Sequence, residues 1–206
     1  MSIASRLREW IAARKERRIE KLTARAADLG ADQEYDILFL QDRGFLRARA
    51  TGQSITRIFG EVESLIRKNL RVVISPGTYF VARGNYQNMV TRERHSFALY
   101  PCSTKSVTID ATCINAGLPI PTETARFYGV KRVSDDLRRF LEAARSADSM
   151  TVQVGVWALT DGYSGSDVQN HLVARDQHGN TRQAVSQANI ADAKRILDQL
   201  GIHNRL

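Results

Sequence analysis

The sequence predicts an α+β protein in which a basic amphipathic helix precedes an antiparallel β-sandwich, and a small helical lobe follows. Three observations predict this order. The first 30 residues alternate apolar and charged side chains at helical spacing, the next part holds short β-rich runs separated by Gly, Pro, Asn and Ser, and the apolar period then becomes helical again. We therefore expect a helix over 1–30, a sandwich over 33–118 and a helical lobe over 119–206.

The N-terminal helix is predicted from two apolar stripes that end at Gly30, where a helix stop is expected. The stripes consist of Ile3, Leu7, Trp10 and Ile11, and then of Ile19, Leu22, Ala26 and Leu29. A basic run, RKERR, separates them, and eight basic side chains stand against four acidic ones in residues 1–30. Such a helix packs on the body of the protein or on a copy of itself, or it lies on an anionic membrane or on nucleic acid. We expect its contacts with a partner to involve Trp10, Arg14, Lys15, Arg17 and Arg18.

The β-rich part predicts six or seven short strands. The runs are YDILFL (35–40), FLRARAT (45–51), SITRIFG (54–60), LRVVIS (70–75), TYFVARG (78–84), HSFALYP (95–101) and SVTIDATC (106–113). Turn residues separate them at the spacing of an antiparallel sandwich. In the last run Cys113 shares the apolar face with Val107, Ile109 and Ala111, whereas Thr112 falls on the polar face.

The pattern from residue 119 onward predicts helices. Ser134 is placed to cap a helix whose apolar positions recur at i, i+3, i+4 and i+7. A second helix is expected over 150–160, followed by a loop at 161–167 and by a turn with a strand end around DQHGN at 176–180. The last helix stops at Gly201, as a helix C-terminus commonly does.

Composition and motifs exclude several classes of protein. Two cysteines in 206 residues are too few for a disulfide scaffold, and the four histidines lack zinc-site spacing, so we expect neither a metal nor another cofactor. The chain holds no Walker phosphate loop, no G-x-S-x-G elbow and no H-E-x-x-H motif. No apolar run reaches the roughly 18–20 residues of a membrane helix, and the first residues lack the apolar core of a signal peptide. We therefore expect a cytoplasmic protein, unless a dedicated system exports it, and the net charge of +8 suggests a polyanionic partner.

The sharpest chemical feature is a pair of segments that begin 40 residues apart at Cys113 and Gln153. The first is Cys113-Ile114-Asn115 at the end of a predicted strand, and the second places Gln153 four residues before Trp157. Together they resemble the bacterial thioester domains of Gram-positive surface adhesins. Those domains carry Cys-hydrophobic-polar in one segment and Thr-Gln-x-Ala-hydrophobic-Trp in a later one.

Three positions depart from this pattern. Val152 replaces the threonine, Gly155 replaces the alanine, and Thr112 stands where an aromatic residue is usual before the cysteine. The gap between the two segments is also short for the family. The resemblance therefore covers two short motifs, together with a β part that leads into a helical, thioester-domain-like lobe.

The resemblance implies an internal thioester. In such a domain the thiolate of Cys113 attacks the side-chain carbonyl of Gln153, ammonia leaves, and an entering nucleophile later captures the acyl group. The resemblance also implies that Trp157 forms an aromatic wall that keeps water out of the pocket, and that Asn115 orients the Gln153 carbonyl. The activity is a single covalent capture without turnover, which is the activity of a binding module.

The residues alone leave a second interpretation open. Cys113 is then an inert core residue at a strand end, Gln153 an exposed helix residue and Trp157 a core anchor. On this interpretation the chain is a non-catalytic structural or interaction protein, and its N-terminal helix docks to a protein partner, a membrane surface or its own oligomer. Nucleic-acid binding is the least favoured alternative, because it rests on charge alone.

Overall fold

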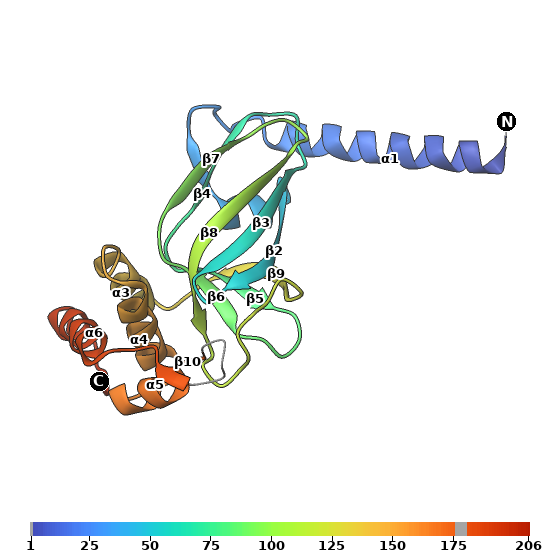
Figure 1. The fold of residues 1–206 in the computed structure, drawn as a ribbon. Helices are drawn as coiled ribbons and strands as arrows, with labels where there is room; N and C mark the ends of the chain where they lie inside the picture. The colour runs from blue at the N-terminus through green and yellow to red at the C-terminus, as the bar shows by residue number, and fades with distance from the viewer. Residues whose placement is uncertain (1, 176–180) are drawn as a thin grey trace. The chain divides into compact units, whose positions relative to one another are not determined.

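A computed structural model describes residues 2–175 and 181–206 (Figure 1). The chain divides into two compact units that alternate along the sequence. Unit 1 comprises Met1–Ala48, Glu61–Ile74 and His95–Val107, and unit 2 comprises Arg49–Gly60, Ser75–Arg94 and Thr108–Leu206. Three strands begin in one unit and end in the other, namely β2 (Leu46–Ser54), β3 (Arg57–Ser64) and β8 (Thr104–Ile114).

Unit 1 begins with α1 (Ile3–Arg25), which confirms the predicted N-terminal helix. The Ser2 hydroxyl accepts a hydrogen bond in its first turn and caps it. At the other end the Lys68 ammonium donates at 2.9, 2.8 and 2.6 Å to three carbonyls, those of Ala26, Ala27 and Leu29. A cation is favoured there because the C-terminal end of the helix dipole and the carbonyl oxygens are both negative.

Unit 1 also holds a three-stranded sheet in the order β1 (Glu34–Asp36), β4 (Leu70–Ile74) and β7 (His95–Leu99). β1 runs parallel to β4, and β7 runs antiparallel to it. The strand predicted over 35–40 is wrong in its second half, where α2 (Ile37–Asp42) forms instead. The Asp36 carboxylate accepts from the Leu38 N–H at 2.9 Å, and this cap starts a helix in spite of the β-rich composition.

Six strands close into a barrel in the order β2-β3-β8-β6-β5-β9 (Figure 1). β5 (Thr78–Ala82) pairs with β6 (Asn88–Thr91), and β9 (Arg126–Arg132) joins β5 to β2. The expected sandwich is therefore corrected to this barrel and the separate three-stranded sheet. Strand β9 lies in the segment predicted to be helical, and alternation along single strands does not indicate whether a sheet closes.

Unit 2 continues with α3 (Asp135–Ala143), α4 (Ser149–Thr160) and α6 (Gln187–Gln199), which confirm the three predicted helices. Between α4 and α6 lie α5 (Gly165–His171) and a hairpin of β10 (Val173–Arg175) and β11 (Thr181–Gln183). The expected loop at 161–167 ends early, because Ser164 and Asp167 form a capping box that starts α5. The expected turn at 176–180 lies outside the described residues. Within the described part of the chain, no helix has both the length and the apolar composition needed to cross a membrane.

Helix α4 is the most buried helix of unit 2, since its residues from Thr151 to Ala158 are all buried. Its Gly155 lies against the ring of Phe140 on α3, so closely that a Cβ at this position would overlap ring atoms. The missing side chain lets the two helices approach one another. This packing buries two polar side chains of α4, those of Thr151 and Gln153, among mostly apolar neighbours.

Candidate functional site

Cys113 and Gln153 meet inside unit 2 through the main chain of the cysteine. The side-chain nitrogen of Gln153 donates to the Cys113 carbonyl at 2.7 Å, and its Oε1 accepts from the Cys113 N–H at 3.1 Å. The Thr112 hydroxyl donates to the same Oε1 at 2.6 Å. Because Gln153 is buried and bonded at both ends of its amide, the alternative in which it is an exposed helix residue is wrong.

The Gln153 side chain takes the place of a neighbouring strand. The Ala111 N–H donates to the carbonyl of Thr56, just before β3 begins, at 3.0 Å. Two residues further along β8, Cys113 presents its N–H and C=O on the same edge. The Gln153 amide fills this position with the two-point pattern of a peptide group. It thereby pairs buried main-chain groups that would otherwise lack a partner, and it attaches α4 to β8.

The sulfur of Cys113 has other neighbours. It lies 3.2 Å from the Met89 sulfur on the paired strand β6, and 3.8 Å from the Ile55 carbonyl oxygen. Burial raises the pKa of this thiol from its usual 9.0 to about 12, because the thiolate would lose its hydration. At neutral pH the group is therefore a neutral thiol, the weakly nucleophilic form of cysteine.

The two predicted pocket residues lie in different surroundings. Asn115 is exposed in a turn with φ +68°, and its side-chain oxygen accepts from the Asn88 amide at 2.7 Å. Trp157 is 1% exposed and meets the rings of Tyr163 and His171 edge-on, with centroids 6.2 and 5.9 Å away. Trp157 therefore packs as an anchor of the helical core.

The residues predicted to contact a partner all lie exposed on α1, namely Trp10, Arg14, Lys15, Arg17 and Arg18. Trp10 is 53% exposed, and the Arg14 guanidinium lies over its ring at 5.3 Å from the centroid. Each residue from Arg6 to Lys15 is exposed, and the apolar side chains of Leu7 and Ile11 are more than half exposed. The first half of α1 is thus a solvated helix with an apolar stripe.

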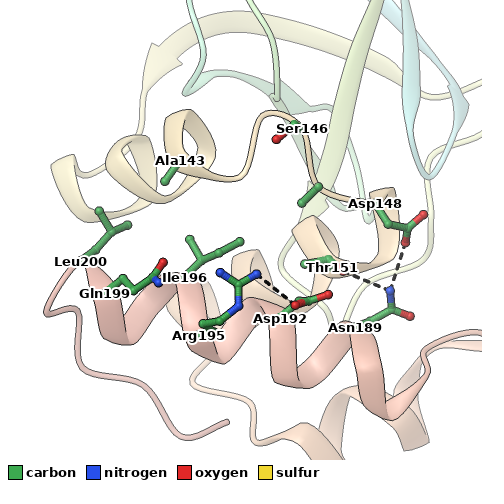
Figure 2. A pocket seen from close by; sticks show the side chains of 11 residues that line it. Ala143, Ser146, Asp148, Thr151, Asn189, Asp192, Arg195, Ile196, Gln199 and Leu200 are labelled. Carbon is green, nitrogen blue, oxygen red and sulfur yellow. Dashed lines mark hydrogen bonds and ion pairs between the residues drawn. The ribbon is translucent and has the colours of Figure 1, made fainter.

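A pocket of about 480 Å³ lies between α3, α4 and α6 (Figure 2). Figure 2 shows the Asn189 amide nitrogen directed at Asp148 Oδ1 and Thr151 Oγ1, at 3.2 and 3.1 Å. Arg195 pairs with Asp192 on the same helix at 3.0 Å. The Asn189 contacts tie α6 to the start of α4, whereas the Arg195–Asp192 pair lies within α6, so these polar groups are already used in contacts inside unit 2.

Sequence reasoning missed two partners of the Cys113–Gln153 contact. Alternation along β8 assigns Thr112 to the polar face, yet the residue is buried and bonded to α4. Met89 belongs to β6, a strand of only four residues that no run in the sequence revealed. A signal for Thr112 was present, because Gln153 is the one polar residue within 152–158 and a buried amide needs a polar partner.

Comparisons with protein-family models, with curated proteins and with solved structures found no match to this chain. The resemblance to thioester domains therefore rests on its two sequence motifs. The residues themselves define a barrel protein with a helical half, a hydrogen-bonded buried amide and an N-terminal helix whose first half is exposed. Among the described residues, no three His, Cys, Asp or Glu side chains gather in a group that could hold a metal ion.

Proposed function

We propose that the protein is a non-catalytic interaction module that docks to its partner through the first half of α1. The observation that carries this proposal is the exposure of four large apolar side chains on that half, those of Ile3, Leu7, Trp10 and Ile11. Folded proteins seldom expose such side chains together unless the surface serves a contact. The buried residue of α1 is Leu22, so the helix is held to unit 1 by its C-terminal part.

The arrangement around Gln153 supports a scaffold role for the rest of the chain. A nucleophilic site needs a thiolate and a reactive carbonyl at contact distance. Here the Cys113 thiol is neutral at physiological pH and lies against Met89, while the Gln153 amide is used in hydrogen bonds to main-chain groups. These features are those of a packed connection between a strand and a helix.

Covalent capture through a Cys113–Gln153 thioester is the second candidate function, and it stays a prediction. It is kept because the two residues are neighbours. The step would form a bond between the cysteine sulfur and the glutamine side-chain carbon, and it would release ammonia with the thiol proton. Intact mass tests it directly. A thioester makes the purified chain lighter by one ammonia, methylamine restores mass, and Cys113→Ala abolishes both effects.

The docking function is tested on the full chain with Leu7, Trp10 and Ile11 all changed to Gln. These positions are exposed on a helix and Gln is a good helix former, so the melting temperature should stay the same. We expect the triple variant to differ from the wild type in sedimentation, in retention on lipid vesicles, or in both. Ala12→Gln with Ala13→Gln is the matched control on α1. Unchanged sedimentation and unchanged vesicle retention would overturn the proposal.

A further inference from the structure

One face of α1 changes character along its length. Six exposed residues follow one another at alternating spacings of four and three, so they lie along one stripe of the helix. In chain order they are Ile3, Leu7, Trp10, Arg14, Arg17 and Lys21. Ile11 and Arg18 flank this stripe at the corresponding levels. The stripe is therefore apolar in the first half of the helix and cationic in the second.

The acidic residues of α1 occupy a different stripe. Glu9, Glu16 and Glu20 are spaced seven and four residues apart, which places them together on one flank. Glu16 also pairs with Arg67 of unit 1. The carboxylates therefore do not dilute the apolar-to-cationic stripe, although a count along the sequence suggests that they do.

The face that packs on unit 1 is a third one. It carries the buried Leu22 and the half-buried Thr23, whose hydroxyl accepts from the Arg67 N–H at 2.9 Å. The residues from Arg6 to Arg14 are all exposed, whereas Lys15 and Arg18 line a pocket with Arg47 and Glu63 of unit 1. The helix up to Arg14 therefore buries little surface in the described structure. An isolated helix of this length is marginal in water, because most helical stability in proteins comes from packing an apolar face. A surface that accepts the stripe would stabilise it.

We propose that this stripe docks on an anionic membrane surface, which deepens and rests on the docking function proposed above. A bilayer interface offers an acyl boundary for Ile3, Leu7 and Ile11, and lipid phosphates for the cationic half. Trp10 lies where the two halves meet, and tryptophan favours the headgroup level of a bilayer. Both halves of the stripe thus find their chemical complement on one partner.

Other partners complement only part of the stripe. In a parallel pair of α1 helices, Arg14 and Arg17 would face the same residues of the second copy, which is repulsive. An antiparallel pair restricted to the apolar half would overlap over only about 13 Å of helix, less than a specific interface of roughly 800 Å² per partner needs. A nucleic acid would take the cationic half and leave Trp10 and its apolar neighbours in water.

The test uses the full chain with vesicles of phosphatidylcholine alone and of phosphatidylcholine mixed with phosphatidylserine. We expect binding to the mixed vesicles only, weakened by salt, with a blue shift of Trp10 fluorescence. The shift reports Trp10 because Trp157 is already buried. Trp10→Ala should weaken binding by about tenfold, which equals about 1.4 kcal/mol. Arg14→Glu with Arg17→Glu should weaken it by tenfold or more, and Lys105→Glu with Lys131→Glu, the same charge change away from α1, should not.

Two results would overturn the inference and leave the docking function standing. One is equal binding to both kinds of vesicle, or binding that the Arg14 and Arg17 reversals do not change. The other is absence of vesicle binding together with an altered sedimentation of the Leu7, Trp10 and Ile11 triple variant. Absence of vesicle binding with unaltered sedimentation would overturn the inference and the docking function together.

Discussion

The sharpest structural prediction concerns Gln153→Ala. The change removes the partner of three buried groups, the Thr112 hydroxyl and the N–H and C=O of Cys113. A buried polar group left unpaired costs about 1–3 kcal/mol, and the shortened side chain leaves a cavity as well. Because the hydroxyl rotates freely and can find another acceptor, we expect a loss of about 3–5 kcal/mol in the free energy of unfolding.

Urea unfolding measures this loss. In a Trp10→Phe background the fluorescence reports Trp157, which lies one helical turn from Gln153 on α4. Gln199→Ala is the matched control, because Gln199 is exposed on a neighbouring helix, and it should change the stability by less than about 0.5 kcal/mol. Cys113→Ala should cost only about 1–2 kcal/mol, since it removes the sulfur and leaves the main-chain hydrogen bonds in place.

The comparison of Gln153→Ala with Cys113→Ala separates hydrogen bonds from a covalent bond. If the two residues were joined through the sulfur, each substitution would break the same bond, and the double variant would be no less stable than either single one. If Gln153→Ala and Cys113→Ala lose the same unfolding free energy, and the double variant loses no more than either, the reasoning from main-chain hydrogen bonds is refuted. Unequal losses that add up would support it.

Three further predictions concern other parts of the fold. Gly155→Ala should lower the free energy of unfolding by about 1–3 kcal/mol, because the new Cβ would overlap the Phe140 ring, and the melting temperature should fall. Gly117→Ala is the control, because its Cβ would meet open space, and it should leave the melting temperature unchanged. The folded chain keeps the Cys113 proton up to about pH 12, whereas the unfolded chain releases it above pH 9.0. The free energy of unfolding, measured from urea midpoints, should therefore fall by about 1.4 kcal/mol per pH unit between these two values. Cys113→Ala should remove this pH dependence. Lys68→Met should lower the free energy of unfolding by about 1–2 kcal/mol and speed amide hydrogen exchange at the end of α1, because three carbonyls lose their cationic donor. Equal exchange rates in the variant and the wild type would contradict this role.

The sequence predicted those elements whose signals are local. Helix α1 follows from the spacing of its apolar residues. Helix α3 begins after Ser134 as expected, but the Ser134 side chain makes no capping hydrogen bond, so the predicted position is right and the predicted cap is wrong. Helix α2 was missed because two local signals disagree there. The β-rich composition favours a strand, but the Asp36 side chain caps a helix, and the helix forms. Local rules thus decide the boundaries, and they mislead where two of them disagree.

The closure of the barrel could not be predicted from these signals. Strand β9 carries only two buried apolar residues, Phe127 and Val130, and it pairs with strands that lie far away in the sequence. Alternation shows that one face of a strand is buried, but pairing partners are set by the whole chain. Alternation along β8 misplaced Thr112 for the same reason, because this residue is bonded to a helix about 40 residues away.

The candidate site was predicted in its members and not in its geometry. The resemblance to thioester domains paired Cys113 with Gln153, and the two residues are neighbours in the structure. Strand phase shows which way a side chain points and says nothing of the main chain, through which they meet. The contact uses the backbone of the cysteine, so the identity of that side chain hardly matters for it. A motif match cannot reveal this difference, because it compares side chains.

A buried polar side chain and an exposed apolar stripe both depart from the usual distribution of polar and apolar residues. The structure satisfies the first of them and leaves the second exposed. Gln153 is a polar residue in an apolar core, but its amide finds the N–H and C=O of Cys113, so the anomaly is resolved within the fold. The apolar stripe of α1 around Trp10 stays more than half exposed, although the Arg14 guanidinium lies over the Trp10 ring. Sequences tolerate an uncompensated feature mainly where it serves function. The exposed stripe of α1 is therefore the feature on which the proposed docking function rests, and the buried amide explains how α4 is attached to β8.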